Sequence, residues 1–276
     1  MFAIGCEGAA CAVDGPASGV VLFDTGPLEG RMSRFSQKGW RLLAGLLVTA
    51  TVTWSVPAPA APQRIVLVRH GEKGGPWTLC QVGRDRARAL ATYYLGKDAQ
   101  KSAFRPGETP KAILAISLHT LETVFPAADS WQMPVVFYAA MPEMVDGRFV
   151  LSEARLSQRT REAARDILEK PEWAGQTLLL YWEHDHVART SDDPEGTEHK
   201  STLYDQLGLG ALTDVPRIWP DNTYDYIWFI DFDQKTGKPI SFSMMKEEFG
   251  APFEDLPQND WGQPEGLKPS SGCILP

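Results

Sequence analysis

The stretch Arg64-Ile-Val-Leu-Val-Arg-His-Gly-Glu72 indicates the fold of this chain more clearly than any other. Residues 64–68 form a short apolar, β-branched run, which predicts a buried strand. Arg69 and His70 follow at the carboxyl end of that strand, where open α/β sheets bind their ligands. Gly71 lets the backbone approach a ligand closely, because glycine has no Cβ.

The rest of the chain from residue 61 alternates strand patterns with helix patterns. Further strands are predicted at Pro110–Ser117, Pro134–Ala139, Gly175–Glu183 and Tyr224–Asp231. Apolar residues at helical spacing predict helices over Leu79–Leu95 and Ser152–Lys170. Ser152 is suited to cap the second helix, because its hydroxyl can accept from the free N–H groups of the first turn.

The C-terminal part of the chain predicts an antiparallel edge to the sheet. Thr236-Gly237 predicts a hairpin turn into a last strand over 240–244, and the Pro- and Gly-rich tail from Glu247 is expected to wrap the surface. We therefore expect residues 61–276 to form one α/β domain of three layers, α/β/α. Its central sheet is mostly parallel and carries an antiparallel hairpin at one edge.

The first sixty residues predict a targeting segment rather than part of the fold. Residues 1–31 show no helical or strand period and are interpreted as an over-extended or disordered leader. A basic stretch, an apolar run over 42–56 and small residues up to Ala60 are the three parts of a secretory signal peptide, predicted here over 32–60. An uncleaved anchor and a buried helix are the alternatives. Cleavage would export the protein to the periplasm or the cell exterior.

The composition excludes several classes of protein. Hydrophobic residues make up 43% and charged residues 22%, which is typical of a globular chain. The formal charge of -8 argues against a nucleic-acid partner, which usually selects a basic surface. No apolar stretch approaches the ~20 residues that a helix needs to cross a bilayer, so no membrane span is expected after signal cleavage.

Two cysteines, Cys80 and Cys273, remain once the signal peptide is removed. Exported proteins fold in oxidising compartments, where thiols can pair. A bridge would tie the C-terminal tail to the first helix, but it requires Cα atoms within ~7 Å of each other. The sequence leaves this pairing open.

Two of the five histidines, His70 and His184, directly follow predicted strands. With Arg69, they can share one pocket at the carboxyl edge of the sheet. The planar guanidinium of arginine matches phosphate oxygens, a neutral histidine is a nucleophile, and a second, cationic histidine can neutralise charge on a transferring group. The pattern therefore indicates phosphoryl chemistry.

These residues carry a resemblance to a known family. The segment Val68–Glu72, followed by the pattern Leu-x3-Gly-x2-Arg-Ala-x2-Leu over Leu79–Leu90, resembles the histidine phosphatase superfamily, which includes the phosphoglycerate mutases. Trp182–His184 fits the second histidine of that pattern, and Trp219–Trp228 is similar to a bacterial branch. The resemblance spans most of residues 64–231 and, with the signal peptide, suggests an exported bacterial member of the Arg-His-Gly type.

The resemblance implies roles for the central residues. His70 would be the nucleophile that takes the phosphoryl group, giving a phosphohistidine that water hydrolyses. Arg69 would clamp the phosphate oxygens, and His184 would stabilise the charge of the transition state from the opposite side. The superfamily uses no metal and no other cofactor.

Further residues are expected to support these three. Gly71, Glu72 and Glu183 adjoin the two histidines and are expected to contact the substrate or to tune the site. The family supplies its proton donor from a loop after the third strand, where Glu143 is the first candidate and Glu153 the second.

One position departs from the family pattern. The family has a second phosphate-binding arginine in a pattern like Ser-x-Arg-x3-Thr, whereas this chain has Ser117, His119 and Thr123. A histidine is only partly cationic near neutral pH. His119 is therefore interpreted either as a pH-dependent phosphate ligand or as a packed residue at a helix start in a degenerate site.

The sequence as a whole predicts a metal-independent phosphohydrolase of the histidine acid-phosphatase type, acting on a small phosphorylated substrate. One alternative is an exported protein of the same fold that has lost turnover and binds an anionic ligand or a partner. Another is a metal centre at His184-Asp185-His186, completed by His199 or Glu198. The substrate and the oligomeric state do not follow from the sequence.

Overall fold

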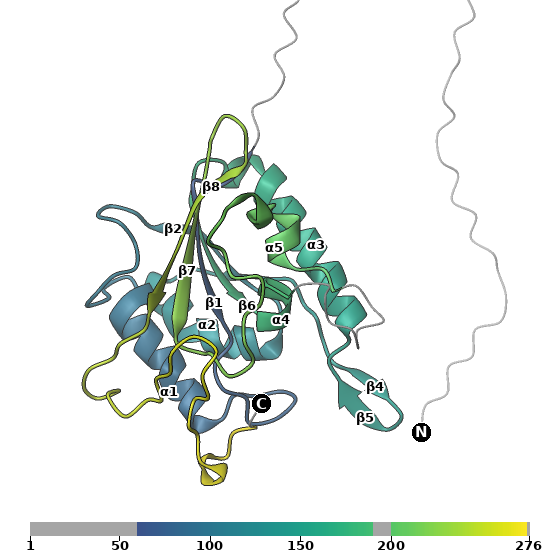
Figure 1. Ribbon diagram of the computed structural model, residues 1–276, viewed down its shortest axis with the longest axis vertical. Coiled ribbons are helices and arrows are strands. Elements are labelled where there is room, and N and C mark those ends of the chain that lie inside the picture. The colour runs from purple at the N-terminus through teal and green to yellow at the C-terminus, as the bar shows by residue number, and fades with distance from the viewer. Residues whose placement is uncertain (1–59, 190–199, 275–276) are drawn as a thin grey trace, which may run out of the picture. The chain divides into compact units, whose positions relative to one another are not determined.

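A six-stranded sheet in the order β3-β2-β6-β1-β7-β8 forms the centre of the protein (Figure 1). The structure is a computed structural model that describes residues 60–189 and 200–274. The strands are β1 Arg64–Arg69, β2 Pro110–Ala115, β3 Val135–Phe137, β6 Thr177–Trp182, β7 Tyr226–Phe232 and β8 Pro239–Lys246. The first four are parallel, and β7 and β8 are antiparallel at one edge. The predicted mixed sheet with its edge hairpin is confirmed.

Alternate side chains of β1 point into two separate hydrophobic cores. Ile65 and Leu67 join a core that includes Leu156 and Ile167 of α3, Glu153–Glu169. Val66 and Val68 join the other core, between the sheet and the helices α1, Gln81–Leu90, and α2, Leu118–Trp131. Because β1 is buried on both faces, its sequence is continuously apolar rather than alternating. The three layers α/β/α are therefore confirmed.

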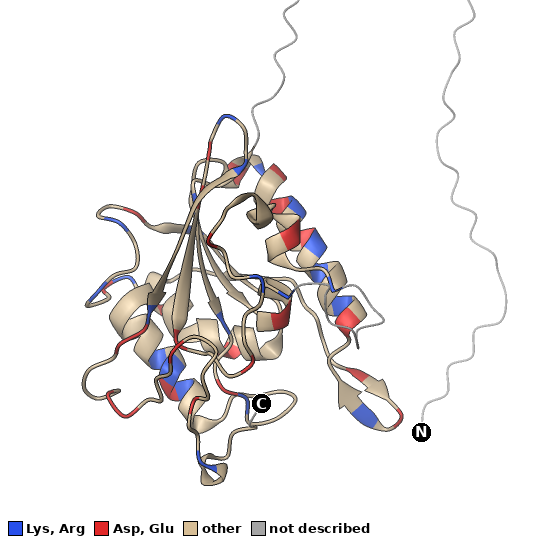
Figure 2. Ribbon diagram, in the orientation of Figure 1, with Lys and Arg blue, Asp and Glu red and all other residues tan. Residues whose placement is uncertain are grey.

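The remaining helical elements are short or extend the longer ones. A π-helical turn continues α1 over Ala91–Leu95, and 3-10 turns cover Pro171–Trp173, Leu209–Ala211 and Pro269–Ser271. The short helices are α4 His184–Val187 and α5 Leu203–Gln206. Ser152 caps α3 as predicted, its hydroxyl accepting from Arg155 N. Charges of both signs alternate along α1 and α3, whereas the central strands are mostly uncharged (Figure 2).

A second, two-stranded sheet replaces the loop that the sequence predicted around Glu143. Its strands, β4 Glu143–Val145 and β5 Arg148–Val150, pair antiparallel and extend from the body in Figure 1. The prediction of a loop is wrong because Asp146 and Gly147, at φ 48° and 76°, form a tight turn of the kind that closes two-residue hairpins. Phe149 contacts Trp77 edge-on, which joins this hairpin to the loop after β1.

The C-terminal tail is bound to α1 both covalently and through ion pairs. Cys80, the N-cap of α1, and Cys273 form a disulfide with Cα atoms 5.1 Å apart. The open question of their pairing is thereby answered. The tail also does more than wrap the surface, because it inserts the carboxylates of Glu247 and Glu265 beside Arg86 of α1.

Arg86 is the centre of a buried cluster of charges. Its guanidinium donates to Glu72 at 2.8 Å, to Glu247 at 3.3 Å and to Glu265 at 3.1 Å. Burial raises the pKa of Glu247 to about 8 and that of Glu265 to about 9, the latter also through its contact with Glu72. One guanidinium thus joins α1, the loop after β1 and two segments of the tail.

The predicted leader, residues 1–31, and the predicted signal peptide lie outside the described residues, apart from Ala60. Their interpretation stays a prediction. Within residues 60–189 and 200–274, no helix has both the length and the apolar character needed to span a bilayer.

Replacing Arg86 should strongly destabilise the protein. An Arg86→Met substitution keeps the length of the side chain but leaves the buried, ionised carboxylate of Glu72 without its cation, and we expect a loss of about 3–5 kcal/mol in the free energy of unfolding. Denaturant titration measures this loss. Arg88→Met is the matched control on the same helix, because the Arg88 side chain is 52% exposed and should change stability by less than ~0.5 kcal/mol. Equal effects of the two substitutions would contradict the role of Arg86.

Candidate active site

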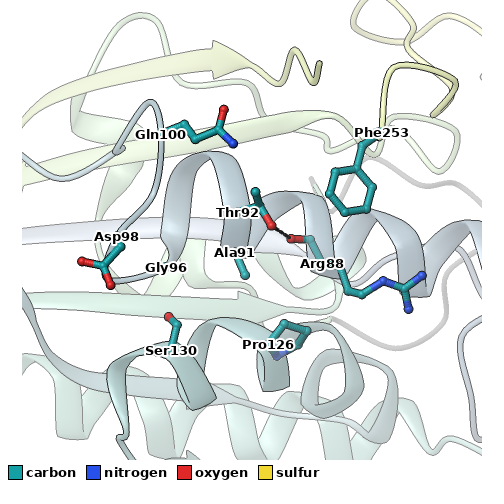
Figure 3. A pocket seen from close by; sticks show the side chains of 9 residues that line it. All are labelled: Arg88, Ala91, Thr92, Gly96, Asp98, Gln100, Pro126, Ser130 and Phe253. Carbon is teal, nitrogen blue, oxygen red and sulfur yellow. Dashed lines mark hydrogen bonds between the residues drawn. The ribbon is translucent and has the colours of Figure 1, made fainter. Parts of the chain in front are cut away.

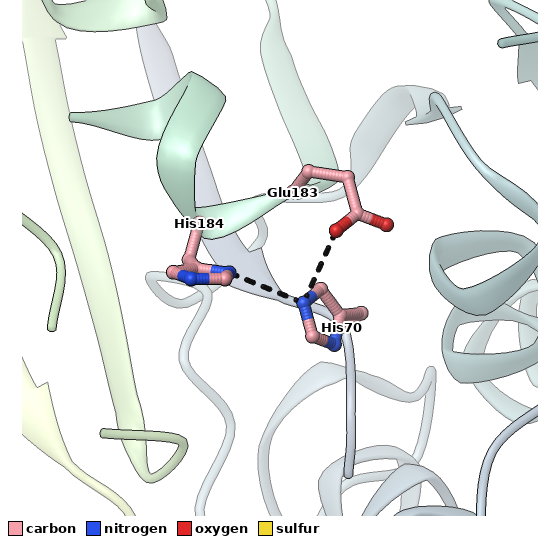
Figure 4. A group of neighbouring side chains, drawn as sticks. All are labelled: His70, Glu183 and His184. Carbon is pink, nitrogen blue, oxygen red and sulfur yellow. Dashed lines mark hydrogen bonds and ion pairs between the residues drawn. The ribbon is translucent and has the colours of Figure 1, made fainter. Parts of the chain in front are cut away.

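The pairing of β1 with β6 brings the two predicted catalytic histidines together. Arg69 is opposite Trp182 in the parallel register, and His70 N donates to Trp182 O at 3.1 Å. The next residues of both strands therefore leave the sheet side by side. Figure 4 shows the imidazoles of His70 and His184 facing each other, with Glu183 beside them.

The hydrogen bonds of His70 define which of its nitrogens is free. Nδ1 lies 2.7 Å from the carbonyl oxygen of Gly71, which can only accept, so Nδ1 carries the proton and Nε2 keeps a lone pair. Nε2 lies 3.4 Å from Arg69 Nη2, 3.3 Å from His184 Nδ1 and 3.2 Å from Glu183 Oε2. Burial lowers the pKa of His70 well below its usual value. A neutral, oriented imidazole of this kind is a nucleophile.

Arg69 is held rigidly by the segment that precedes β7. Its Nη1 donates to the carbonyl oxygens of Pro220, Asp221 and Thr223 at 2.9–3.0 Å. The ring of Tyr224 lies 3.8 Å from the guanidinium carbon. Nη2 is thereby directed at the two histidines, where it can meet an anion with little loss of side-chain entropy.

His184, the first residue of α4, lies between Arg69 and Asp221. Its Nε2 is 3.0 Å from Asp221 Oδ1, so Nε2 donates and Nδ1 accepts from Arg69 Nη2 at 3.1 Å. Burial, followed by the nearby Arg69, lowers the pKa of His184. Sequence reasoning did not identify Asp221 as the partner of His184, because the two residues are far apart in the chain.

Glu183 contacts side chains from several different elements of the site. Its carboxylate accepts from Ser117 Oγ at 2.5 Å and from Lys73 Nζ at 2.9 Å. His119 Nδ1 lies 3.7 Å from it. The sequence analysis did not identify Lys73 as a site residue, because it lies in a Gly- and Pro-rich loop. That loop folds back so that Lys73 contacts Glu183.

His119, at the start of α2, also lies in this group. Its Nε2 lies 2.8 Å from the carbonyl oxygen of Gly75, and it therefore donates to the loop that follows β1. His119 therefore has one nitrogen bound to the backbone and the other directed toward Glu183, and its interpretation as a phosphate ligand stays a prediction.

The other predicted site residues have structural partners of their own. Gly71 stays at the site through its carbonyl oxygen, which accepts from His70 Nδ1. A Cβ at Gly71 would lie 2.8 Å from the carbonyl oxygen of Gly83, so glycine is required there for close packing against α1. Glu72 pairs with Arg86, and Glu143 pairs with Arg155. The second proton-donor candidate, Glu153, contacts His186 and Lys200.

The described residues contain two groups of three side chains whose atoms lie close enough to hold a metal ion: His70, Glu183 and His184, and His184, Asp185 and Asp221. In the first group, Arg69 and Lys73 already donate to two of the three ligand atoms. A bound cation would therefore have to displace two positive side chains.

The predicted metal cluster at His184-Asp185-His186 depended on these residues forming a strand, and that premise is wrong. They form the helix α4, in which side chains two residues apart point in different directions. His186 instead bonds to Ser201 O at 2.8 Å and contacts Glu153. The third ligand considered, His199 or Glu198, lies outside the described residues.

A separate hollow of about 430 Å³ lies beside α1 and α2, as Figure 3 shows. It is lined by residues such as Arg88, Asp98, Pro126 and Phe253. None of the predicted site residues lines it, so it is unrelated to the histidine group.

Comparisons with known proteins give only distant structural matches. No family model matches the chain, and no curated protein matches it. A native structure of mycobacterial glucosyl-3-phosphoglycerate phosphatase aligns with 67% of this chain and 97% of its own length, at 14% identity and a TM-score of 0.37. A protein described as mycobacterial hydrolase 1 aligns with 68% of this chain and 99% of its own length, at 15% identity and a TM-score of 0.38. Likenesses of this extent do not establish what this chain does.

The protonation of His70 can be measured directly. We expect nitrogen NMR to show a neutral imidazole with its proton on Nδ1 at a pH where an ordinary histidine, with its pKa of ~6.5, is already half protonated, because burial lowers the pKa of His70. The nitrogen signals of the buried His186, which contacts Ser201 and Glu153 instead, can be compared with those of His70 in the same spectrum. An imidazolium signal for His70 at pH 7 would contradict the assignment of Nε2 as a free nucleophile.

Proposed function

We propose that this protein is a metal-independent phosphohydrolase of the histidine acid-phosphatase type, acting on phosphomonoesters through a phosphohistidine. The observation that carries the proposal is the bond from His70 Nδ1 to Gly71 O. It leaves the Nε2 lone pair facing Arg69 and His184. This is the arrangement that attack on phosphorus requires.

In the proposed reaction, Nε2 of His70 attacks phosphorus and the bond to the ester oxygen breaks. Arg69 Nη2 binds a phosphoryl oxygen, since Nη1 of the same guanidinium is fixed by backbone carbonyls. The arriving negative charge favours a second proton on His184, at Nδ1, while Asp221 holds the proton on Nε2. Water then attacks phosphorus, the P–N bond breaks and phosphate leaves.

The leaving oxygen also needs a proton. Glu143 stays our predicted donor, but it pairs with Arg155 in the described structure. It would have to leave this partner to reach the histidine group.

We also propose that the protein is exported to the periplasm or the cell exterior. The predicted signal peptide supports this, and so does the disulfide between Cys80 and Cys273, since such bonds persist in oxidising compartments.

A second candidate function is binding without turnover. The observation that favours it is the carboxylate of Glu183, 3.2 Å from Nε2 of the proposed nucleophile. With His119 in place of an arginine, the described site also has one cation fewer than the family pattern implies.

Turnover of a generic aryl phosphate by the full-length chain separates these functions. With a chelator present and the pH varied from ~5 to 8, we expect turnover that His70→Ala reduces to background. His184→Ala should reduce it by roughly 10²–10³, the effect of losing a donor that stabilises developing charge. His186→Gln is the control, because His186 contacts Glu153 and Ser201 rather than His70.

The other outcomes are equally informative. Turnover that disappears on chelation would contradict the metal-independent mechanism and would favour a metal at His70, Glu183 and His184. An absence of turnover at every pH, with phosphate still bound, would favour the binding function.

A further inference from the structure

The carboxylate of Glu183 lies where a phosphoryl group must arrive. Its Oε2 atom is 3.2 Å from His70 Nε2, the atom proposed to attack phosphorus. A phosphorus atom that approaches Nε2 brings its oxygens into contact with this carboxylate. Any ligand of the site must therefore be compatible with Glu183.

Glu183 is buried and held as an anion. Lys73 Nζ and the Ser117 hydroxyl donate to its two oxygens. An ionised carboxylate can only accept hydrogen bonds. Toward His70 it meets the lone pair of Nε2, so two acceptors face each other with no proton between them.

The charge of the site is smaller than that of a typical phosphate pocket. Among the described residues, Arg69 and Lys73 bring two positive charges to the group around Nε2, and Glu183 and Asp221 bring two negative charges. Burial lowers the pKa of His70 and of His184, so both imidazoles favour the neutral form before a ligand arrives. An arginine at position 119 would have added a further positive charge. The site as built therefore favours a ligand of low negative charge.

We propose that Glu183 makes this site selective for phosphoryl groups that carry a proton. A P–OH group donates to Glu183 Oε2, whereas an oxygen without a proton meets a like charge at contact distance. A phosphate ester keeps such a proton only below its second pKa of ~6. The inference rests on the proposed function of the same pocket and specifies its substrate as the monoanionic ester.

The pH dependence of binding by itself does not test this proposal. Glu183 is faced by His70 and Lys73 from the end of β1 and its loop, by His119 from α2, and by Arg69 and His184 across the site. Protonation of His70 or His184 in acid would also strengthen anion binding. A comparison of two anions at one pH removes this ambiguity.

Phosphate and sulfate provide that comparison, because they have similar size and shape. At pH 7.5 both forms of inorganic phosphate keep at least one proton, whereas sulfate has none. Calorimetric titration of the full-length chain should show sulfate binding at least ~30-fold more weakly than phosphate, as expected when a hydrogen bond to a charged group is lost.

Glu183→Gln should remove the discrimination. The glutamine keeps the size of the side chain, but its NH₂ group donates to a sulfate oxygen and its negative charge is gone. We expect sulfate to bind this variant within about threefold of phosphate. Glu162→Gln on α3 is the control, because Glu162 pairs with Arg159, and it should keep the selectivity of the parent.

Each outcome has a distinct meaning. Equal binding of phosphate and sulfate by the unaltered protein would overturn this inference and leave the proposed phosphate site in place. An absence of phosphate binding would overturn the proposed function itself. Circular dichroism checks that the Glu183→Gln variant is folded. If the folded variant still binds sulfate much more weakly than phosphate, the selectivity belongs to another acceptor, such as His184 Nδ1, and the role of Glu183 is overturned. If that variant does not fold, the comparison of the two anions in the unaltered protein decides.

Discussion

The parallel pairing of β1 with β6 is the constraint on which the rest of the site depends. Its register places Arg69 opposite Trp182, so His70, Glu183 and His184 leave the sheet at one point. Both strands are buried on both faces, and a slip of one residue would move every side chain to the opposite core. The geometry of the histidine pair is therefore fixed by the hydrophobic packing of the two whole strands, which involves many more residues than the site itself.

The loop after β1 needs support of its own, because it leaves the sheet directly beside the imidazole of His70. Gly71 packs against Gly83 of α1 too closely for any larger residue at either position. Glu72, next in the chain, is bound to Arg86. The tail adds two more carboxylates to the same guanidinium and a disulfide at the start of α1, so the C-terminus stabilises the loop on which His70 depends.

The site is also distinguished by the balance of its charges. Arg69 has three of its hydrogen bonds fixed by backbone carbonyls, and Lys73 is paired with Glu183. His119 donates to Gly75 instead of presenting a permanent positive charge. The carboxylate of Glu183 lowers the positive charge beside His70 Nε2, which favours ligands of lower negative charge.

The sequence by itself determined the strands of the central sheet, their order of appearance and the position of Arg69, His70 and His184 at strand ends, because apolar runs and strand-end polar residues are local features. It could not place Lys73, Asp221 or Arg86 with its carboxylates, since each acts on a residue far away in the chain. Glu72 looked equivalent to Glu183, because both adjoin a strand-end histidine, and Glu143 was expected to donate a proton. Only the tertiary structure decided that Glu183 faces His70 Nε2 while Glu72 and Glu143 pair with arginines, because side-chain direction depends on what packs around each residue.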